Sequence, residues 1–181
     1  MSDQAKQGLL SPYLQRARIK AALPHISGDV LDIGCGNGAL ATFVPPERYC
    51  GYDRAADTVA AAAQRCPRHA FSDTPPQRAT FDTVVALAVI EHMKDPAAAL
   101  REWAHYLRDG GHVVITTPHK SFRLAHEAGS VLGVFSRDAA EEHETMFDRG
   151  TLMRLATDVG LKFCVYRRFL LGGNQLCVMA K

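Results

Sequence analysis

The chain has 181 residues, of which 47% are hydrophobic and 22% are charged, and its formal net charge is +2. This length corresponds to one domain over 1–181 with a substantial core, and it leaves no room for the separate catalytic domain that dinucleotide-dependent dehydrogenases usually carry. No segment approaches the roughly eighteen uninterrupted apolar residues of a membrane span, and the scattered basic residues form no stripe for nucleic acid.

The first expected element is a helix that begins at Ser11-Pro12 and ends before Pro24. Serine is a frequent N-cap, and proline is favoured in the first turn of a helix. Small and apolar residues then recur at helical spacing, at Leu14, Ala17 and Ala21. Because this helix precedes the first expected strand, we expect residues 1–28 to form an N-terminal cap helix on the domain.

The segment Val30–Gly38, which reads VLDIGCGNG, carries the most informative pattern of the chain. A strand expected over 29–33 runs into a loop that contains Gly34, Gly36 and Gly38. Glycines at this spacing let a strand turn sharply into a helix and let backbone N–H groups approach a ligand that a Cβ would exclude. The pattern predicts a nucleotide-type cofactor loop, followed by a short helix that Pro45-Pro46 ends.

A second acidic residue, Asp53, follows the strand expected over 49–52 and stands nineteen residues after Gly34. At this position in a strand–helix–strand unit, a carboxylate commonly binds ribose hydroxyls. An alanine-rich helix over 58–65 is expected next, with Asp57 as its N-cap.

The rest of the chain continues to alternate strands and helices. The expected elements are strands over 69–71, 81–90 and 112–117, a helix from Asp95-Pro96 to Gly110-Gly111, a helix around 152–159, and strands over 162–170 and 175–180 on either side of the turn 172–174. This order predicts an α/β fold with a doubly wound, mostly parallel seven-stranded sheet and an antiparallel C-terminal edge hairpin. Residues 119–148 interrupt the pattern, and we expect them to form an insertion that is partly helical.

Five cysteines stand at positions 35, 50, 66, 164 and 177, an odd number without C-x-x-C or another metal-type spacing. The N-terminal sequence MSDQAKQG is polar and lacks the apolar stretch of a signal peptide. We therefore expect free thiols in a reducing compartment and a cytoplasmic location.

Two kinds of cofactor use such a glycine loop, and charge distinguishes them. With Ala39 as the third small residue, the loop fits the dinucleotide pattern G-x-G-x-x-[GA], so NAD is an alternative. A pyrophosphate, however, would lie beside Asp32, and no Lys or Arg occurs between Asp32 and Pro46 to compensate. S-adenosylmethionine has no phosphate and carries an ammonium and a sulfonium, which a carboxylate attracts. The charges therefore favour S-adenosylmethionine.

Taken in order, the motifs over 30–118 resemble those of the class I S-adenosylmethionine-dependent methyltransferases, most closely the small-molecule group that includes the ubiquinone and menaquinone biosynthesis enzymes. The matching segments are VLDIGCGNG, Tyr52-Asp53, FDTVVALAVIEHMKDP and LRDGGHVVITTPH. The resemblance implies a Rossmann-like fold and methyl transfer to a small molecule. Glu91-His92 stands where methyltransferases of adenine or glutamine amines carry [DN]-P-P-[YF], so these acceptors are not expected.

The resemblance also implies which residues bind the cofactor. The glycine loop would hold the methionine end of the cofactor, and the residues after the second strand would bind its ribose. The residues after the third strand would contact the adenine edge, and those at the end of the fourth strand would form the floor of the cofactor site. These positions are Asp32, Gly34, Cys35, Gly36, Gly38, Asp53, Arg54, Ser72, Asp73, Leu87 and Ala88. Tyr13 and Arg16, on the N-terminal helix, are either contacts for the cofactor carboxylate or ordinary surface residues.

Methyl transfer is an in-line displacement in which the protein mainly aligns the reactants. An oxygen acceptor, which we favour over carbon or nitrogen, still gains from a general base, and histidine suits this role near neutral pH. The candidates are His92, His119 and His143, although each is also expected to be an ordinary packed or solvated residue.

Three further expectations follow from the same segments. Glu91, His92 and Asp95 include metal-ligand types, but Asp95 is explained as a helix cap, so no metal site is predicted. The insertion over 120–148 is expected to form a lid and acceptor wall. A cofactor-binding module without catalysis is the remaining alternative, and no pattern indicates an oligomeric state.

Overall fold

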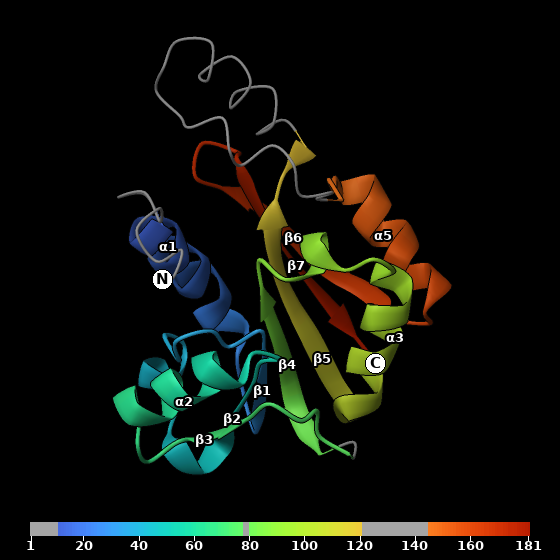
Figure 1. The fold of residues 1–181 in the computed structure, drawn as a ribbon. Helices are drawn as coiled ribbons and strands as arrows, with labels where there is room; N and C mark the ends of the chain where they lie inside the picture. Colours follow the sequence, from blue (N-terminus) through green and yellow to red (C-terminus); the bar gives the residue numbers. More distant parts are fainter. Residues whose placement is uncertain (1–10, 78–79, 121–144) are drawn as a thin grey trace, which may run out of the picture.

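The computed structural model describes residues 11–77, 80–120 and 145–181, and within them it has seven strands in one sheet (Figure 1). The strands are β1 (Val30–Ile33), β2 (Tyr49–Tyr52), β3 (Ala70–Ser72), β4 (Phe81–Leu87), β5 (Leu107–Pro118), β6 (Lys162–Phe169) and β7 (Asn174–Ala180). Their order in the sheet is β3-β2-β1-β4-β5-β7-β6. Neighbours from β3 to β5 are parallel, and β7 pairs antiparallel with β5 and with β6. The predicted fold class is confirmed.

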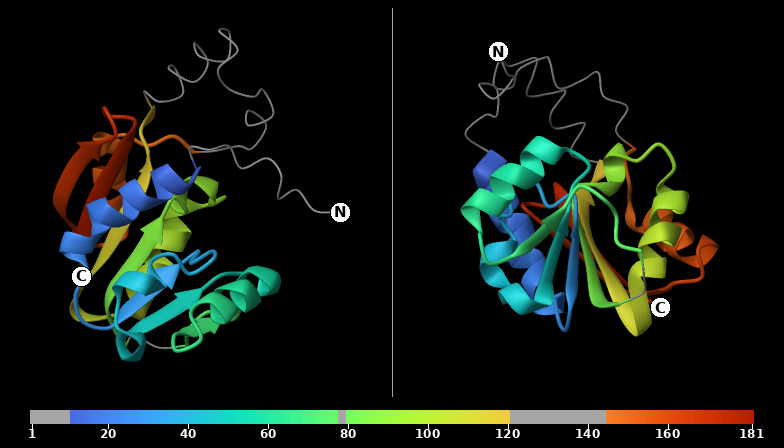
Figure 2. Two further views of the ribbon diagram at one scale, coloured as in Figure 1. Left: turned by 90° about the vertical axis from the view of Figure 1, so that its left-hand side faces the viewer. Right: turned by 60° about the horizontal axis from the view of Figure 1, so that its bottom comes forward.

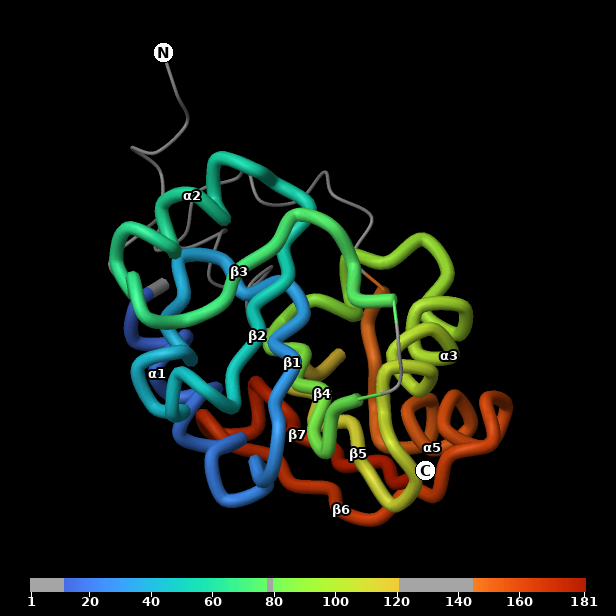
Figure 3. The backbone as a smooth tube through the Cα atoms, turned by 90° about the horizontal axis from the view of Figure 1, so that it is seen from below, coloured from blue at the N-terminus to red at the C-terminus, as the bar shows by residue number. Residues whose placement is uncertain are grey.

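Helices cover both faces of this sheet, as Figures 2 and 3 show. The helices α1 (Ser11–Ala22) and α2 (Ala56–Arg65) lie on one face, and α3 (Pro96–Tyr106) and α5 (Arg149–Asp158) lie on the other. No helix in the described ranges is both long and apolar enough to cross a membrane.

The sheet separates two hydrophobic cores. Residues of α3 and α5, such as Trp103 and Leu152, pack with Leu31 and Ile115 of the sheet. On the other face, Ile19 and Ala22 of α1 pack with strand residues that include Val30, Val85 and Val114. Alternate residues of a strand share a face, so Asp32 lies on the same face as Val30, toward α1.

Glycine and proline explain why the loop after β1 forms no α-helix, contrary to the prediction. Gly36 and Gly38 have φ angles of 53° and 73°, which a right-handed helix does not accommodate. Pro45 then limits the remaining stretch to less than two helical turns. The loop instead contains turns and the short 3₁₀ helices η3 (Ala41–Phe43) and η4 (Pro46–Arg48).

The strand expected over 81–90 ends three residues earlier, at Leu87. Ala88 has a φ of 60°, which breaks the extended backbone, and the chain continues into the 3₁₀ helix η5 (Ile90–His92). Because the strand ends early, Ala88 and the residues after it lie at the carboxyl end of β4, beside the carboxyl ends of its neighbours β1 and β5.

Two helix boundaries also differ from expectation. The helix α2 begins at Ala56 after the N-cap Ala55, so Asp57 lies in its first turn and the prediction that Asp57 is the N-cap was wrong. The helix α3 ends at Tyr106, because Leu107 joins β5 and pairs with Phe81 of β4. The expected cap at the start of α3 is confirmed, since the Ala98 N–H donates to Asp95 Oδ1 over 2.9 Å.

Candidate functional site

The carboxyl ends of the parallel strands meet at one edge of the sheet and bring the predicted cofactor residues together. Ile33 at the end of β1 pairs with Tyr52 of β2 and with Ala86 of β4. The strand order reverses between β1 and β4, and ligands of open α/β sheets bind at such a switch point. The Ala88 N–H donates to Thr116 O over 2.8 Å, which ties the exit of β4 to β5 at this edge.

The three glycines of the loop all have positive φ angles but different surroundings. A Cβ on Gly34 would lie 2.6 Å from Val89 Cγ2, and one on Gly38 would lie 3.0 Å from Phe71 Cζ. A Cβ on Gly36 would meet nothing within 4 Å. The backbone at Gly36 is therefore the part of the loop that a ligand can approach, while Gly34 and Gly38 make room for neighbouring side chains.

Asp53 connects the glycine loop to the start of α2. The Gly36 N–H donates to Asp53 Oδ2 over 3.1 Å, and the Ala55 N–H donates to Oδ1 over 3.1 Å. A carboxylate has about four acceptor positions, so both oxygens can still accept hydroxyl protons. Because Asp53 is only half-buried, a ribose could reach it without displacing either hydrogen bond.

Asp32 is buried below the loop, with 3% of its surface exposed. The Tyr49 hydroxyl donates to Asp32 Oδ2 over 2.7 Å. Burial raises the pKa of Asp32 to about 7, the Tyr49 hydrogen bond opposes this rise, and the charge of Asp53 adds to it. The carboxyl group therefore titrates near neutral pH.

Tyr49 is a site residue that the sequence did not indicate. On β2 it stands two residues before Gly51, which pairs with Asp32. The contact between the two side chains can be predicted only when the register of β1 and β2 is known. This register places the tyrosine on the same face of the sheet as the buried acid.

The predicted adenine residues lie beside Asp53. The Asp53 N–H donates to Ser72 O over 3.2 Å, and the Ser72 hydroxyl donates to Thr74 O over 2.8 Å. Asp73 and Arg54 are exposed at the same rim, and Leu87 and Ala88 are half-buried at the end of β4. Cys35, within the loop, is buried.

The two described histidine candidates follow neighbouring strands. His92 is exposed at the end of η5, after β4. His119 follows β5 and is 9% exposed, and its backbone N–H donates to Gly173 O over 3.0 Å. Burial, Arg168 and Lys120 lower the pKa of His119, against an opposing effect of Asp148, which favours the neutral form of its ring. His143 lies outside the described residues.

Glu91 is a buried carboxyl group that the sequence suggested only as a metal ligand. It is 1% exposed, and the Thr117 hydroxyl donates to Glu91 Oε2 over 2.9 Å. Burial raises its pKa, whereas the charges of Arg18 and His92 lower it. Among the residues the structure describes, no three His, Cys, Asp or Glu side chains are placed to hold a metal ion.

Tyr13 and Arg16 are exposed on α1, which is compatible with both alternatives for these residues. A different residue of this helix reaches the strand edge. Arg18 Nε donates to Asn174 Oδ1 over 2.9 Å, and Asn174 is buried at the start of β7. This bond ties the middle of α1 to the edge of the sheet where the candidate site lies.

The comparisons with known proteins agree with this geometry. Residues 6–165 match the family model described as a methyltransferase domain. The chain belongs to the class I S-adenosylmethionine-dependent methyltransferases. The predicted family and its cofactor are thereby confirmed.

Two curated relatives and one solved structure illustrate the similarity. A ubiquinone biosynthesis O-methyltransferase of Serratia proteamaculans is 32% identical over 108 residues, which cover 51% of this chain and 43% of the relative. A probable S-adenosylmethionine-dependent methyltransferase of Mycolicibacterium smegmatis is 36% identical over 99 residues, covering 51% and 38%. A possible histamine N-methyltransferase of Thermotoga maritima has a TM-score of 0.75 at 17% identity, covering 93% and 92%, and supports the fold. The matched region thus spans less than half of either curated relative.

The residues of this methyltransferase domain fit S-adenosylmethionine better than a dinucleotide. The open backbone at Gly36 donates its N–H to Asp53, and the strand that leads into this loop carries the buried Asp32. Residues 33–45 contain no Lys or Arg. Such a cradle suits an ammonium and a sulfonium and disfavours a pyrophosphate.

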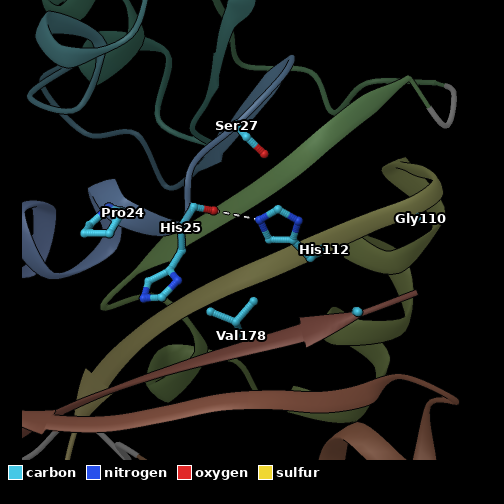
Figure 4. A pocket seen from close by; sticks show the side chains of 7 residues that line it. Pro24, His25, Ser27, Gly110, His112 and Val178 are labelled. Atoms are coloured by element: carbon cyan, nitrogen blue, oxygen red, sulfur yellow. Dashed lines mark hydrogen bonds between the residues drawn. The ribbon is translucent and has the colours of Figure 1, made fainter.

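A cavity of about 310 Å³ lies elsewhere in the methyltransferase domain, at the amino end of β5 (Figure 4). Its lining includes His25, Ser27, His112 and Val178, and the His112 ring donates from Nε2 to His25 O over 2.6 Å. Since the cofactor residues follow the carboxyl ends of the strands, this cavity is separate from the candidate site.

Proposed function

We propose that the protein transfers a methyl group from S-adenosylmethionine to a small-molecule acceptor, at an oxygen atom, in the cytoplasm. The observation that carries the proposal is the open backbone of Gly36, which is hydrogen-bonded to Asp53 and follows the strand that carries the buried Asp32, at the switch point of a methyltransferase fold. The oxygen acceptor is supported by the Serratia relative, which is an O-methyltransferase.

The cofactor residues would act in three groups. The Gly34–Gly36 backbone would hold the methionine end, and Asp32 would balance its positive charge from below the loop. Asp53 would accept hydrogen bonds from the ribose hydroxyls while keeping its bonds to Gly36 and Ala55. Arg54, Ser72 and Asp73 would border the adenine, and Leu87 and Ala88 would form the floor.

The bound cofactor would supply the electrophilic methyl group, and the protein would orient the acceptor and remove its proton. His119 is the favoured base, because its lowered pKa favours the neutral ring that can accept a proton, and because it follows β5 at the candidate site. A ring nitrogen of His119 would take the hydroxyl proton as the acceptor oxygen attacks, an effect worth about 10²–10⁴-fold in rate. His92 and His143 remain further candidates for this role.

The acceptor side of the site would be built around residues 119–148. Residues 121–144 of this proposed wall lie outside the described residues, whereas residues 119–120 and 145–148 lie within them. Gln175 Nε2 donates to Pro118 O over 3.0 Å and to Phe147 O over 2.9 Å, and Lys120 pairs with Asp148. The segment therefore starts and finishes beside His119, where an acceptor would lie.

Isothermal titration calorimetry with S-adenosylhomocysteine tests the cofactor site. Asp53→Ala removes the acceptor for two ribose hydroxyls, so we expect its affinity to fall at least tenfold, which corresponds to about 1.4 kcal/mol. Asp57→Ala, on the exposed start of α2, is the matched control and should bind like the wild type. Unchanged affinity in Asp53→Ala would contradict the proposed site.

Transfer of a labelled methyl group to a panel of phenols, carboxylic acids and amines tests the reaction. We expect labelled methyl ethers or esters. Tight cofactor binding without any methylated product would favour the alternative of a cofactor-binding module. Stronger binding of NADH than of S-adenosylhomocysteine would favour an NAD-binding protein.

A further inference from the structure

Tyr49 and Asp32 form a buried hydroxyl–carboxyl pair directly below the proposed cofactor loop. The two side chains are joined by a 2.7 Å hydrogen bond, and the residues are 4% and 3% exposed. Two edge-to-face contacts hold the tyrosine ring, with centroids 5.6 Å from Phe71 and 5.5 Å from His69. The packed ring keeps the hydroxyl group at the carboxyl oxygen.

No lysine or arginine is among the titratable groups of the described residues that act on this pair. These groups are Asp53 across the loop, the thiols of Cys35 and Cys50, and His69 beside the tyrosine ring. His69 Nε2 lies 3.0 Å from Val44 O. Both burial and Asp53 therefore favour the protonated form of Asp32.

A bound cation reverses this balance. With an ammonium or sulfonium at Gly36, the ionised carboxylate gains an opposite charge, and its proton affinity falls. The Tyr49 hydroxyl already donates to Asp32 Oδ2, so it stabilises the carboxylate that remains. The Asp32 carboxyl group can therefore change from its neutral to its ionised form while both side chains keep their positions.

We propose that Tyr49 is a positioning residue that couples binding of the cationic cofactor to release of the Asp32 proton. The inference rests on the proposed function, because it requires S-adenosylmethionine at Gly36. In the step, the Asp32 carboxyl O–H bond breaks, the proton passes to buffer, and the resulting carboxylate accepts the Tyr49 hydrogen bond and neutralises the incoming positive charge. No oxidant, reductant or further reactant is needed.

Calorimetry of the full chain with S-adenosylmethionine, in phosphate and in Tris between pH 6 and 9, measures the protons released on binding. Asp32→Asn provides the baseline number of released protons, since its side-chain amide does not titrate. Any protons that this variant releases come from the cofactor's amine and from other groups. We expect the wild type to release about half a proton more than Asp32→Asn at pH 7. Its affinity should fall below pH 7 by up to tenfold per pH unit.

Tyr49→Phe tests the role of the hydroxyl group. Without its hydrogen bond the carboxylate is less stable, so the extra proton release should move to higher pH and affinity at pH 7 should fall severalfold, while affinity at pH 9 changes less. Tyr106→Phe is the matched control, because it removes a hydroxyl that donates to Glu102 on α3, away from the site. It should leave the proton count unchanged.

The outcomes separate the two proposals. Equal proton release by the wild type and Asp32→Asn, or a Tyr49→Phe profile that matches the wild type, overturns the coupling. If Tyr49→Phe fails to fold, the comparison of the wild type with Asp32→Asn still decides whether Asp32 releases the proton. Absence of cofactor binding by the wild type at every pH instead overturns the proposed function.

Discussion

Gly36 and Gly38 have similar backbone angles but face different surroundings. Gly36 faces open space, whereas Gly38 faces the ring of Phe71 and the methyl group of Ala62. Glycine at 38 therefore serves packing, and glycine at 36 leaves a surface that a ligand can approach. A sequence motif gives the two positions equal weight, and the structure assigns them different roles.

Substitution by alanine should separate these roles. In Gly36→Ala the positive φ costs about 1–2 kcal/mol of unfolding free energy, and the new methyl group occupies the ligand surface, so affinity for S-adenosylhomocysteine should fall more than tenfold. Gly38→Ala carries the same backbone cost plus a 3.0 Å approach to Phe71, so its larger loss should be in stability. Urea unfolding and calorimetry measure the two effects. Normal cofactor affinity in Gly36→Ala would refute the assignment of the open surface.

At the candidate site, the sequence predicted the residues that stand at a typical spacing within one segment of the chain. It did not predict contacts that form through the pairing of strands. Asp32, Gly36 and Asp53 are recognisable because their spacing along the chain reflects one strand–loop–strand unit. The partnership of Tyr49 with Asp32 depends on the register of β1 and β2, and the burial of Glu91 under Thr117 depends on the pairing of β4 with β5. Neither register is encoded locally.

At the scale of elements, periodicity and turn residues predicted every described strand and α-helix, whereas two of their ends were wrong. The apolar run after Phe81 continues to Ile90 in sequence, but the positive φ of Ala88 ends the strand. Likewise, Leu107 fits the helical spacing of α3 and is taken into β5 by pairing with Phe81. In both cases tertiary contacts override the local pattern.

The start of α5 offers a prediction about its N-cap. Asp148 Oδ1 accepts the Thr151 N–H over 2.8 Å and the Thr151 hydroxyl over 2.9 Å, and Lys120 pairs with the same carboxylate. Asp148→Ala should therefore lower the free energy of unfolding at pH 7 by about 0.5–2 kcal/mol. Urea denaturation of the variant and the wild type measures the difference.

Asp148→Asn and a pH series separate the cap from the charge. Asparagine is an equally good N-cap, so this variant should lose less stability than Asp148→Ala at pH 7. The bonds from Lys120 and Thr151 lower the pKa of Asp148, so its ionic contribution is present above the unfolded value near pH 4 and is lost as pH falls below it. The difference in the free energy of unfolding between the wild type and Asp148→Asn should accordingly become smaller at acid pH. A difference that does not change with pH would exclude the ionic contribution.

In the whole molecule, the candidate site sits where the two halves of the sheet meet. The glycine loop follows β1 and Asp53 follows β2, whereas Ala88 and His119 follow β4 and β5 (Figure 1). A ligand at this edge would contact both halves, and its contacts would exist only when β1 pairs with β4. We therefore expect cofactor binding to be linked to the folding of the whole sheet.

Thermal unfolding with S-adenosylhomocysteine should reveal this linkage. A ligand that binds only the folded state at 100 times its dissociation constant stabilises the protein by about 2.7 kcal/mol, which raises Tm by about 5–10 °C for a domain of this size. The same concentration of NADH should leave Tm unchanged, because its pyrophosphate would lie between Asp32 and Asp53. Asp53→Ala should reduce the shift in proportion to its loss of affinity. A shift from NADH as large as that from S-adenosylhomocysteine would show that these carboxyl groups do not select the cofactor by charge.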